Sequence, residues 1–171
     1  MKSFLKLCLT LCCCGLFFCA WINPCAAQGK AGKYGFGIKD TVDPEEAFTI
    51  IGRYWFSDRL ALDGNFGFRY IDVNDDKAND YKRFLFGIGL NQYLLGPQKF
   101  NPFVGLDFLV RADDLRKGET DTTSELDGKF GGEYFLAERF SLSAEALLKL
   151  RFGDEDEFGT GGRLGMIFYL N

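Results

Sequence analysis

Apolar and polar residues alternate one by one along most of the chain, and the pattern is clearest over 163–171. One face of this segment carries Leu164, Met166, Phe168 and Leu170. The opposite face carries Arg163, Gly165, Ile167 and Tyr169. A side-chain period of two is typical of a β-strand, whereas a helix repeats its apolar positions every three or four residues. The segment is therefore predicted to be a strand with one apolar and one mixed face.

Seven more segments alternate in the same way, and their spacing predicts a repeating hairpin. The eight predicted strands are 33–39, 47–56, 59–70, 83–94, 102–111, 126–136, 140–152 and 163–171. Short connections lie at 57–59, 96–99 and 137–139, and long ones at 40–46, 72–80, 112–125 and 153–158. The short turns recur every 40 residues, as expected for a repeat of strand, long loop, strand and tight turn. The pattern predicts an all-β fold, an eight-stranded antiparallel up-and-down barrel.

A closed barrel leaves no free sheet edge, but two kinds of barrel have eight strands. A soluble, lipocalin-like barrel turns its apolar face inward, whereas a transmembrane barrel turns it toward lipid. Phe, Tyr, Leu and Met crowd the apolar face of this chain, while most glycines lie on the charged face. The interior of an eight-stranded barrel is narrow and suits small residues beside a few long polar ones. The alternation of short and long loops is that of outer-membrane barrels, and the strands are long enough to cross a bilayer. We therefore predict a transmembrane barrel.

The mixed face carries charges of both signs, which we expect to lie in the lumen. The predicted lumenal charges are Arg53, Asp63, Arg69, Arg83, Asp107, Arg111, Asp127, Lys129, Glu133, Glu145, Lys149, Arg151 and Arg163. Eight of these are basic and five are acidic, so any residual conductance is expected to favour anions. We expect the charges to pair with one another and to plug the lumen. The alternative is that they line a narrow porin-like channel for small solutes or ions.

The N-terminal segment has the three parts of a secretory signal. The basic start MKSFLK precedes an apolar run and small residues at 25–27, as a signal peptidase site requires. We predict that 1–27 is a cleaved signal peptide and that 28–171 is the barrel domain. A retained membrane anchor and a lipoprotein signal are the alternatives. All six cysteines lie within 8–25, so the cleaved chain can form neither a disulfide nor a thiolate metal site.

Charge and composition narrow the classes of function. Without 1–27 the chain holds 18 basic and 24 acidic residues, a balance that argues against nucleic-acid binding. The predicted long loops hold 17 acids and three bases. Their carboxylates are candidates for binding a divalent cation or a surface ligand. The alternative is a solvated acidic rim that keeps the outer surface from self-associating.

The sequence offers little for catalysis. It contains no histidine, which is the commonest general base in hydrolases and acyltransferases. Ser141 and Ser143 lie near Glu145 on one predicted strand, where we interpret the serines as small residues that fill the lumen. The Gly-x-Gly pairs lie inside strands with no following helix, unlike a dinucleotide-binding motif. We predict no enzymatic activity and no catalytic, cofactor or metal site.

The last strand also carries a recognisable motif. Its polar residue, its glycine two positions later and its two late hydrophobic residues resemble the insertion signal of bacterial outer-membrane barrels. These residues are Arg163, Gly165, Phe168 and Leu170. The whole of 33–170 resembles the small OmpA/OmpX-like outer-membrane barrels. The resemblance implies a location in the bacterial outer membrane, contact with its lipid, periplasmic chaperones and insertion by the barrel-assembly machinery. We expect a structural or surface-interaction role.

Overall fold

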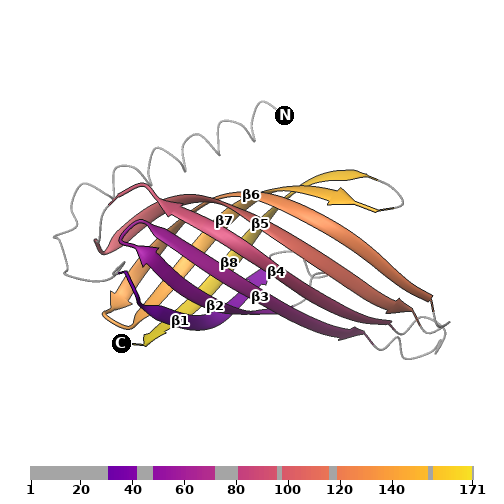
Figure 1. Cartoon of the computed structure of the whole chain (residues 1–171), viewed down its shortest axis with the longest axis horizontal. Helices are drawn as coiled ribbons and strands as arrows, with labels where there is room; N and C mark the ends of the chain where they lie inside the picture. Colours follow the sequence, from indigo (N-terminus) through magenta and orange to yellow (C-terminus); the bar gives the residue numbers. More distant parts are fainter. Residues whose placement is uncertain are drawn as a thin grey trace, which may run out of the picture.

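The computed structural model describes residues 31–41, 48–71, 81–95, 98–115, 119–153 and 156–170. The predicted signal peptide and large parts of the predicted long loops lie outside these ranges. The described residues form the strands β1 (Tyr34–Thr41), β2 (Phe48–Ser57), β3 (Leu60–Ile71), β4 (Tyr81–Tyr93), β5 (Phe100–Leu115), β6 (Glu119–Ala137), β7 (Phe140–Phe152) and β8 (Glu157–Leu170). They make one closed barrel in chain order (Figure 1).

Every strand pairs antiparallel with the strands before and after it. The barrel closes between β1 and β8, through pairs that run from Tyr34↔Leu170 to Thr41↔Arg163. The predicted eight-stranded antiparallel up-and-down barrel is therefore confirmed, and the apolar last strand is paired along its edge. Within the described residues, no helix has the length and hydropathy that a membrane crossing requires.

The side chains of each strand alternate between the two faces of the barrel. Along the described middle part of all eight strands the odd-numbered residues point into the lumen and the even-numbered ones point outward, whereas the odd-numbered Ser57, Asp121, Ala137 and Glu157 near strand ends are exposed. The outward face is apolar, with exposures of 62% for Ile88, 61% for Leu164 and 57% for Leu106. The predicted facing is confirmed, and a lipocalin-like barrel is excluded because its apolar face would be buried. An apolar outer wall of this kind is the surface that a transmembrane barrel presents to lipid.

The prediction was wrong about two of the long connections. Residues 112–115 and 119–125 belong to β5 and β6, where Arg111 pairs with Thr123 and Asp113 with Asp121. Similarly, β8 begins at Glu157, within the segment predicted as the last loop. Backbone hydrogen bonds join strands whatever their side chains are, so pairing continues where the outward face has become polar. The alternation of apolar residues marks only the part of a strand that faces lipid.

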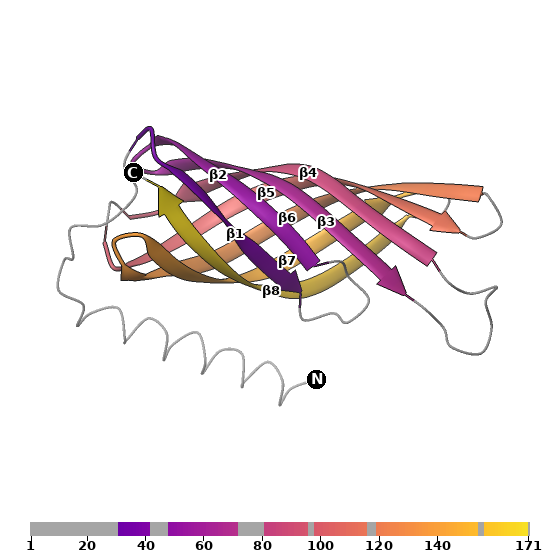
Figure 2. The ribbon, with the colours of Figure 1, turned by 90° about the horizontal axis from the view of Figure 1, so that it is seen from below.

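The two ends of the barrel differ in shape. The turns β2–β3 and β6–β7 and the C-terminus lie at one end, which we name the turn end (Figure 1). The opposite end, named the long-loop end, carries the connections β1–β2, β3–β4, β5–β6 and β7–β8, of which β3–β4 (72–80) is the longest in the barrel. There β5 and β6 reach furthest, as Figure 2 also shows from below. They are also the two longest strands, with 16 and 19 residues, whereas β1 has 8.

Candidate functional site

The lumen is the candidate site, and its first layer lies near the turn end. A cluster of buried, mainly aromatic residues fills it, named here the aromatic layer: Ile51, Trp55, Ala61, Tyr93, Phe103, Phe135, Ile167 and Tyr169. Ring centroids are 4.4 Å apart for Trp55 and Tyr93, and 5.2 Å for Tyr93 and Phe103. Trp55 and Phe103 have no exposed surface. The sequence placed some of these residues on the mixed face but did not predict that they form a layer.

Lumenal glycines make room for this layer. A Cβ added at Gly35 would lie 2.9 Å from the ring of Tyr169, and one at Gly131 would lie 2.8 Å from Cζ of Phe103. Gly35 is the pairing partner of Tyr169, and Gly131 that of Phe103, so each ring packs directly over the backbone of the neighbouring strand. This agrees with the expectation that a narrow interior alternates large side chains with small ones.

Above the aromatic layer, Arg53 is the centre of a buried ion-pair network. Its guanidinium donates to both carboxylate oxygens of Asp63, over 2.6 Å from Nε and 2.8 Å from Nη2. Its Nη1 donates to Glu133 over 2.8 Å and to the hydroxyl of Tyr93 over 2.7 Å. A bidentate arginine–carboxylate pair has a demanding geometry and is among the stronger protein hydrogen-bond arrangements.

Tyrosine hydroxyls join this network to the aromatic layer below it. The hydroxyl of Tyr169 donates to Glu133 over 2.6 Å. The hydroxyls of Tyr93 and Ser141 also donate to the same carboxylate. The tyrosines therefore have their rings in the apolar layer and their polar tips in the charged layer. The hydroxyl of Ser141 thereby contributes to holding the Glu133 carboxylate in place.

The network continues toward the middle of the barrel. Lys39 bridges Asp63, at 3.1 Å, and Glu145, at 2.7 Å. Arg163 then lies 3.6 Å from Glu145, 2.9 Å from Asp107 and 3.0 Å from Asp127. Lys129 pairs with Asp107 from the other side. These ion pairs connect residues of β1, β2, β3, β5, β6, β7 and β8 across the lumen, with every distance at most 3.6 Å.

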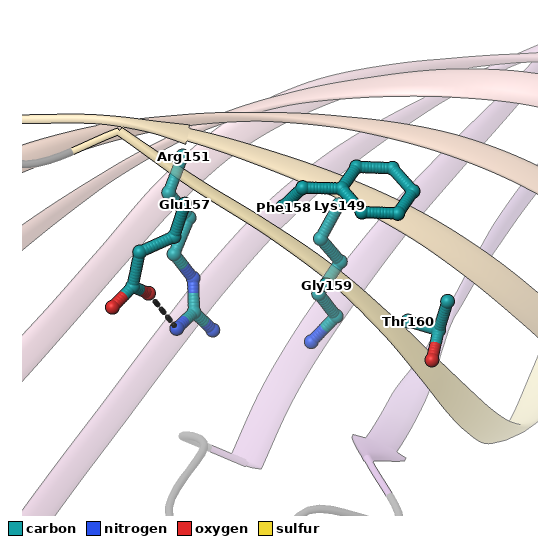
Figure 3. Close-up of a pocket in the computed structure, with 6 residues that line it drawn as sticks. All are labelled: Lys149, Arg151, Glu157, Phe158, Gly159 and Thr160. Atoms are coloured by element: carbon teal, nitrogen blue, oxygen red, sulfur yellow. Dashed lines mark hydrogen bonds and ion pairs between the residues drawn. The ribbon is translucent and has the colours of Figure 1, made fainter.

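The ion pairs near the long-loop end are looser and more exposed. Glu125 accepts from Arg151 over 2.5 Å and from Arg111 over 3.3 Å. Arg151 is also 3.4 Å from Glu157, whose side chain is 65% exposed. A cavity of about 440 Å³ lies beside these groups, lined by Lys149, Arg151, Glu157, Phe158, Gly159 and Thr160. Figure 3 shows Lys149, Arg151 and Glu157 pointing to the same side of the β7–β8 hairpin.

The structure places the predicted lumenal charges at different depths. Arg53, Asp63, Asp107, Arg111, Asp127, Lys129, Glu133, Glu145, Lys149 and Arg163 are buried. Arg69, Arg83 and Arg151 are only partly buried, and Arg83 pairs with Asp113 over 2.7 and 2.8 Å. Lys39 and Glu125 are also buried, although they are not among the predicted lumenal charges. Alternation would have placed Lys39 inward, since it follows the outward-facing Ile38.

The fully buried lumenal charges are equal in number. Among the described residues the buried cations are Lys39, Arg53, Arg111, Lys129, Lys149 and Arg163. The buried acids are Asp63, Asp107, Glu125, Asp127, Glu133 and Glu145. Six charges of each sign balance at this depth, and the expected basic excess remains a prediction that depends on the partly buried Arg69, Arg83 and Arg151.

The residues of the predicted insertion signal separate between the two faces of β8. Arg163 and Gly165 point into the lumen, whereas Phe168 and Leu170 point outward and are 42% and 47% exposed. As for metals, the described ranges contain no group of three or more Asp, Glu, His or Cys residues placed to hold an ion.

Solved structures share this architecture. The N-terminal β-barrel domain of Pseudomonas aeruginosa OprF matches with a TM-score of 0.58 and 15% identity, over 81% of this chain and 96% of that one. Neisserial surface protein A (NspA) matches with a TM-score of 0.49 and 14% identity, over 80% and 92%. Ail, the attachment invasion locus protein of Yersinia pestis, matches with 0.45 and 13%, over 82% and 99%. No protein-family model and no curated protein matches the sequence.

The likeness to the OprF barrel concerns the fold, and the facing of the side chains agrees with it. The chain has the closed eight-stranded architecture of the small OmpA/OmpX-like barrels. Its apolar residues face outward and its charges face inward. The protein thus has the fold and the lipid-facing surface of a bacterial outer-membrane β-barrel.

Proposed function

We propose that this chain is an outer-membrane barrel protein with a structural or surface-interaction role, whose lumen is closed by its own side chains. The observation that carries the proposal is the balanced lumen. In the described part of the chain, six buried cations and six buried acids lie inside a barrel whose outer wall is apolar. Charges that satisfy one another in a narrow bore favour a rigid wall over a path for ions.

The proposal includes an orientation and a biogenesis route. Outer-membrane barrels have short periplasmic turns and longer external loops. We therefore place the turn end in the periplasm and the long-loop end outside the cell. The partners would be outer-membrane lipid at the apolar wall, and periplasmic chaperones and the barrel-assembly machinery during insertion. The motif at 163–170 would be the segment that the machinery recognises.

A surface-interaction role is supported by the acidic long-loop end. Asp40, Asp121 and Asp156 are exposed there, and further acids follow in the connections that lie outside the described residues. A hard divalent cation or a basic surface on another molecule would fit this charge. No catalytic role is proposed, since the sequence lacks histidine and the buried serine at 141 holds Glu133.

The membrane part of the proposal is tested with the protein expressed from its full sequence. We expect β-rich circular dichroism only in detergent micelles or lipid vesicles, and a shift in gel mobility between boiled and unboiled samples. A stable, soluble β-protein in plain buffer would contradict the proposal.

The closed lumen is tested by recording ion current across planar bilayers that contain the protein. We expect no channel events above those of the bare bilayer. The competing function is a narrow porin-like channel, which is favoured by the cavity of about 440 Å³ at the long-loop end. Reproducible stepwise currents from the unmodified protein would establish the channel and refute the closed lumen.

A further inference from the structure

Two chemically different closures follow one another along the lumen. The first is the aromatic layer at the turn end, and the second is the ion-pair network centred on Arg53 above it. The two meet at Tyr93 and Tyr169, whose rings are in the first and whose hydroxyls contact Arg53 at 2.7 and 3.4 Å. They are therefore in series along any path that an ion would take.

The aromatic layer spans the bore by itself. Its members come from β2, β3, β4, β5, β6 and β8, and their side chains are at most 2% exposed. On β1 the position next to Tyr169 is Gly35, where an added Cβ would lie only 2.9 Å from the ring, so the ring occupies the space that a side chain would need. An apolar constriction that water does not fill blocks ions, because an ion cannot lose its hydration shell there at an acceptable cost.

The ion-pair network spans the bore independently of these rings. Arg53 on β2 reaches Asp63 on β3 and Glu133 on β6, and Lys39 connects Asp63 to Glu145 on β7. Each of these side chains is at most 1% exposed. Their positions are held by several charge-assisted hydrogen bonds, so a single bond can break without moving the rest.

We infer that the lumen is sealed twice in series, so that the aromatic layer and the Arg53-centred network each block ion flow without the other. The inference rests on the proposed closed lumen and adds the location of its closure. It also implies that the part of the lumen between Arg53 and the long-loop end is open only at the long-loop end. The cavity beside Lys149 and Arg151 belongs to this open part (Figure 3).

The experiment compares ion currents of four proteins in planar bilayers. These are the unmodified protein, Arg53→Ala, the double variant Trp55→Ala/Phe103→Ala, and the triple variant that combines them. The gel shift between boiled and unboiled samples establishes that each variant is folded. Where an alanine variant does not fold, Arg53→Ala/Glu133→Ala replaces the first, and valine replaces alanine at 55 and 103.

We expect the unmodified protein and both partial variants to remain silent, and only the combined variant to show stepwise currents. Current from Arg53→Ala alone would show that the aromatic layer does not seal, and current from the aromatic variant alone would show the same of the network. A folded but silent combined variant would place the closure elsewhere and overturn the inference. Current from the unmodified protein would instead refute the proposed closed lumen itself.

Discussion

The two ends of the lumen contain the same kinds of side chain under different conditions. At the turn end, Arg53 and its partners Asp63 and Glu133 have no exposed side-chain surface. At the long-loop end, Arg151 is 25% exposed and its partner Glu157 is 65% exposed. Both are arginine–carboxylate pairs between neighbouring or facing strands, yet only the first pair lies above a layer of packed rings.

Burial, and not the type of residue, therefore determines how much a lumenal ion pair contributes to the free energy of unfolding. A buried charge that loses its partner cannot be rehydrated, so the remaining charge is costly. Breaking an exposed ion pair costs little stability, because water solvates both groups and salt screens them. The turn end is therefore expected to hold the barrel together, and the long-loop end to tolerate change.

The largest expected effect is that of Arg53→Ala. The change removes the shared partner of Asp63 and Glu133, and we expect a loss of about 3–5 kcal/mol in the free energy of unfolding, as for a broken buried ion pair. Urea unfolding in lipid vesicles, followed by tryptophan fluorescence and by the gel shift, measures it. A loss no larger than that of Glu157→Ala would remove the distinction between the two ends.

A smaller effect is expected for Tyr169→Phe, which keeps the ring but removes the hydroxyl that donates to Glu133 over 2.6 Å. Hydrogen bonds to charged groups contribute about 1.5–3 kcal/mol, and the loss of stability should fall in that range. The matched control is Tyr34→Phe, whose ring faces outward and is 59% exposed. Equal effects of both changes would show that the hydroxyl of Tyr169 does not support the network.

Two lumenal glycines differ in the space that surrounds them. A Cβ at Gly105 would lie 2.3 Å from the carbonyl of Leu90 and 2.6 Å from Cε of Lys129, whereas a Cβ at Gly159 would meet nothing within 4 Å. We expect Gly105→Ala to cost about 1–3 kcal/mol through overpacking. Gly159→Ala should be neutral or slightly stabilising, because it restricts the unfolded chain. Urea unfolding of both variants checks this, and a reversed order would contradict the two packing environments.

The smallest effect is expected for Glu157→Ala. The exposed ion pair with Arg151 is worth about 0–1 kcal/mol, and Arg151 keeps its hydrogen bond to Glu125. Raising the salt concentration should reduce the difference between this variant and the unmodified protein. A loss of more than about 2 kcal/mol, insensitive to salt, would mean that the long-loop end is as tightly closed as the turn end.

The sequence alone determined the barrel and the facing of its walls. Successive side chains of a strand point to opposite faces because of local backbone geometry. A period of two therefore predicts which residues face lipid wherever the outward face is apolar, as from Leu164 to Leu170. The same signal failed at 119–125, because a polar strand beyond the lipid looks like a loop. Glu125 was missed as a lumenal charge for that reason.

Which charges form ion pairs, and which residues close the lumen, could be seen only in the tertiary structure. Arg53 contacts Asp63 at ten residues' separation and Glu133 at 80, because the tilt and register of eight strands bring these positions to one level. Alternation predicts on which face of the sheet a side chain lies, but not its position along the barrel axis. The aromatic layer could not be predicted for the same reason, since its rings are single inward positions on five strands that become neighbours only when the sheet closes.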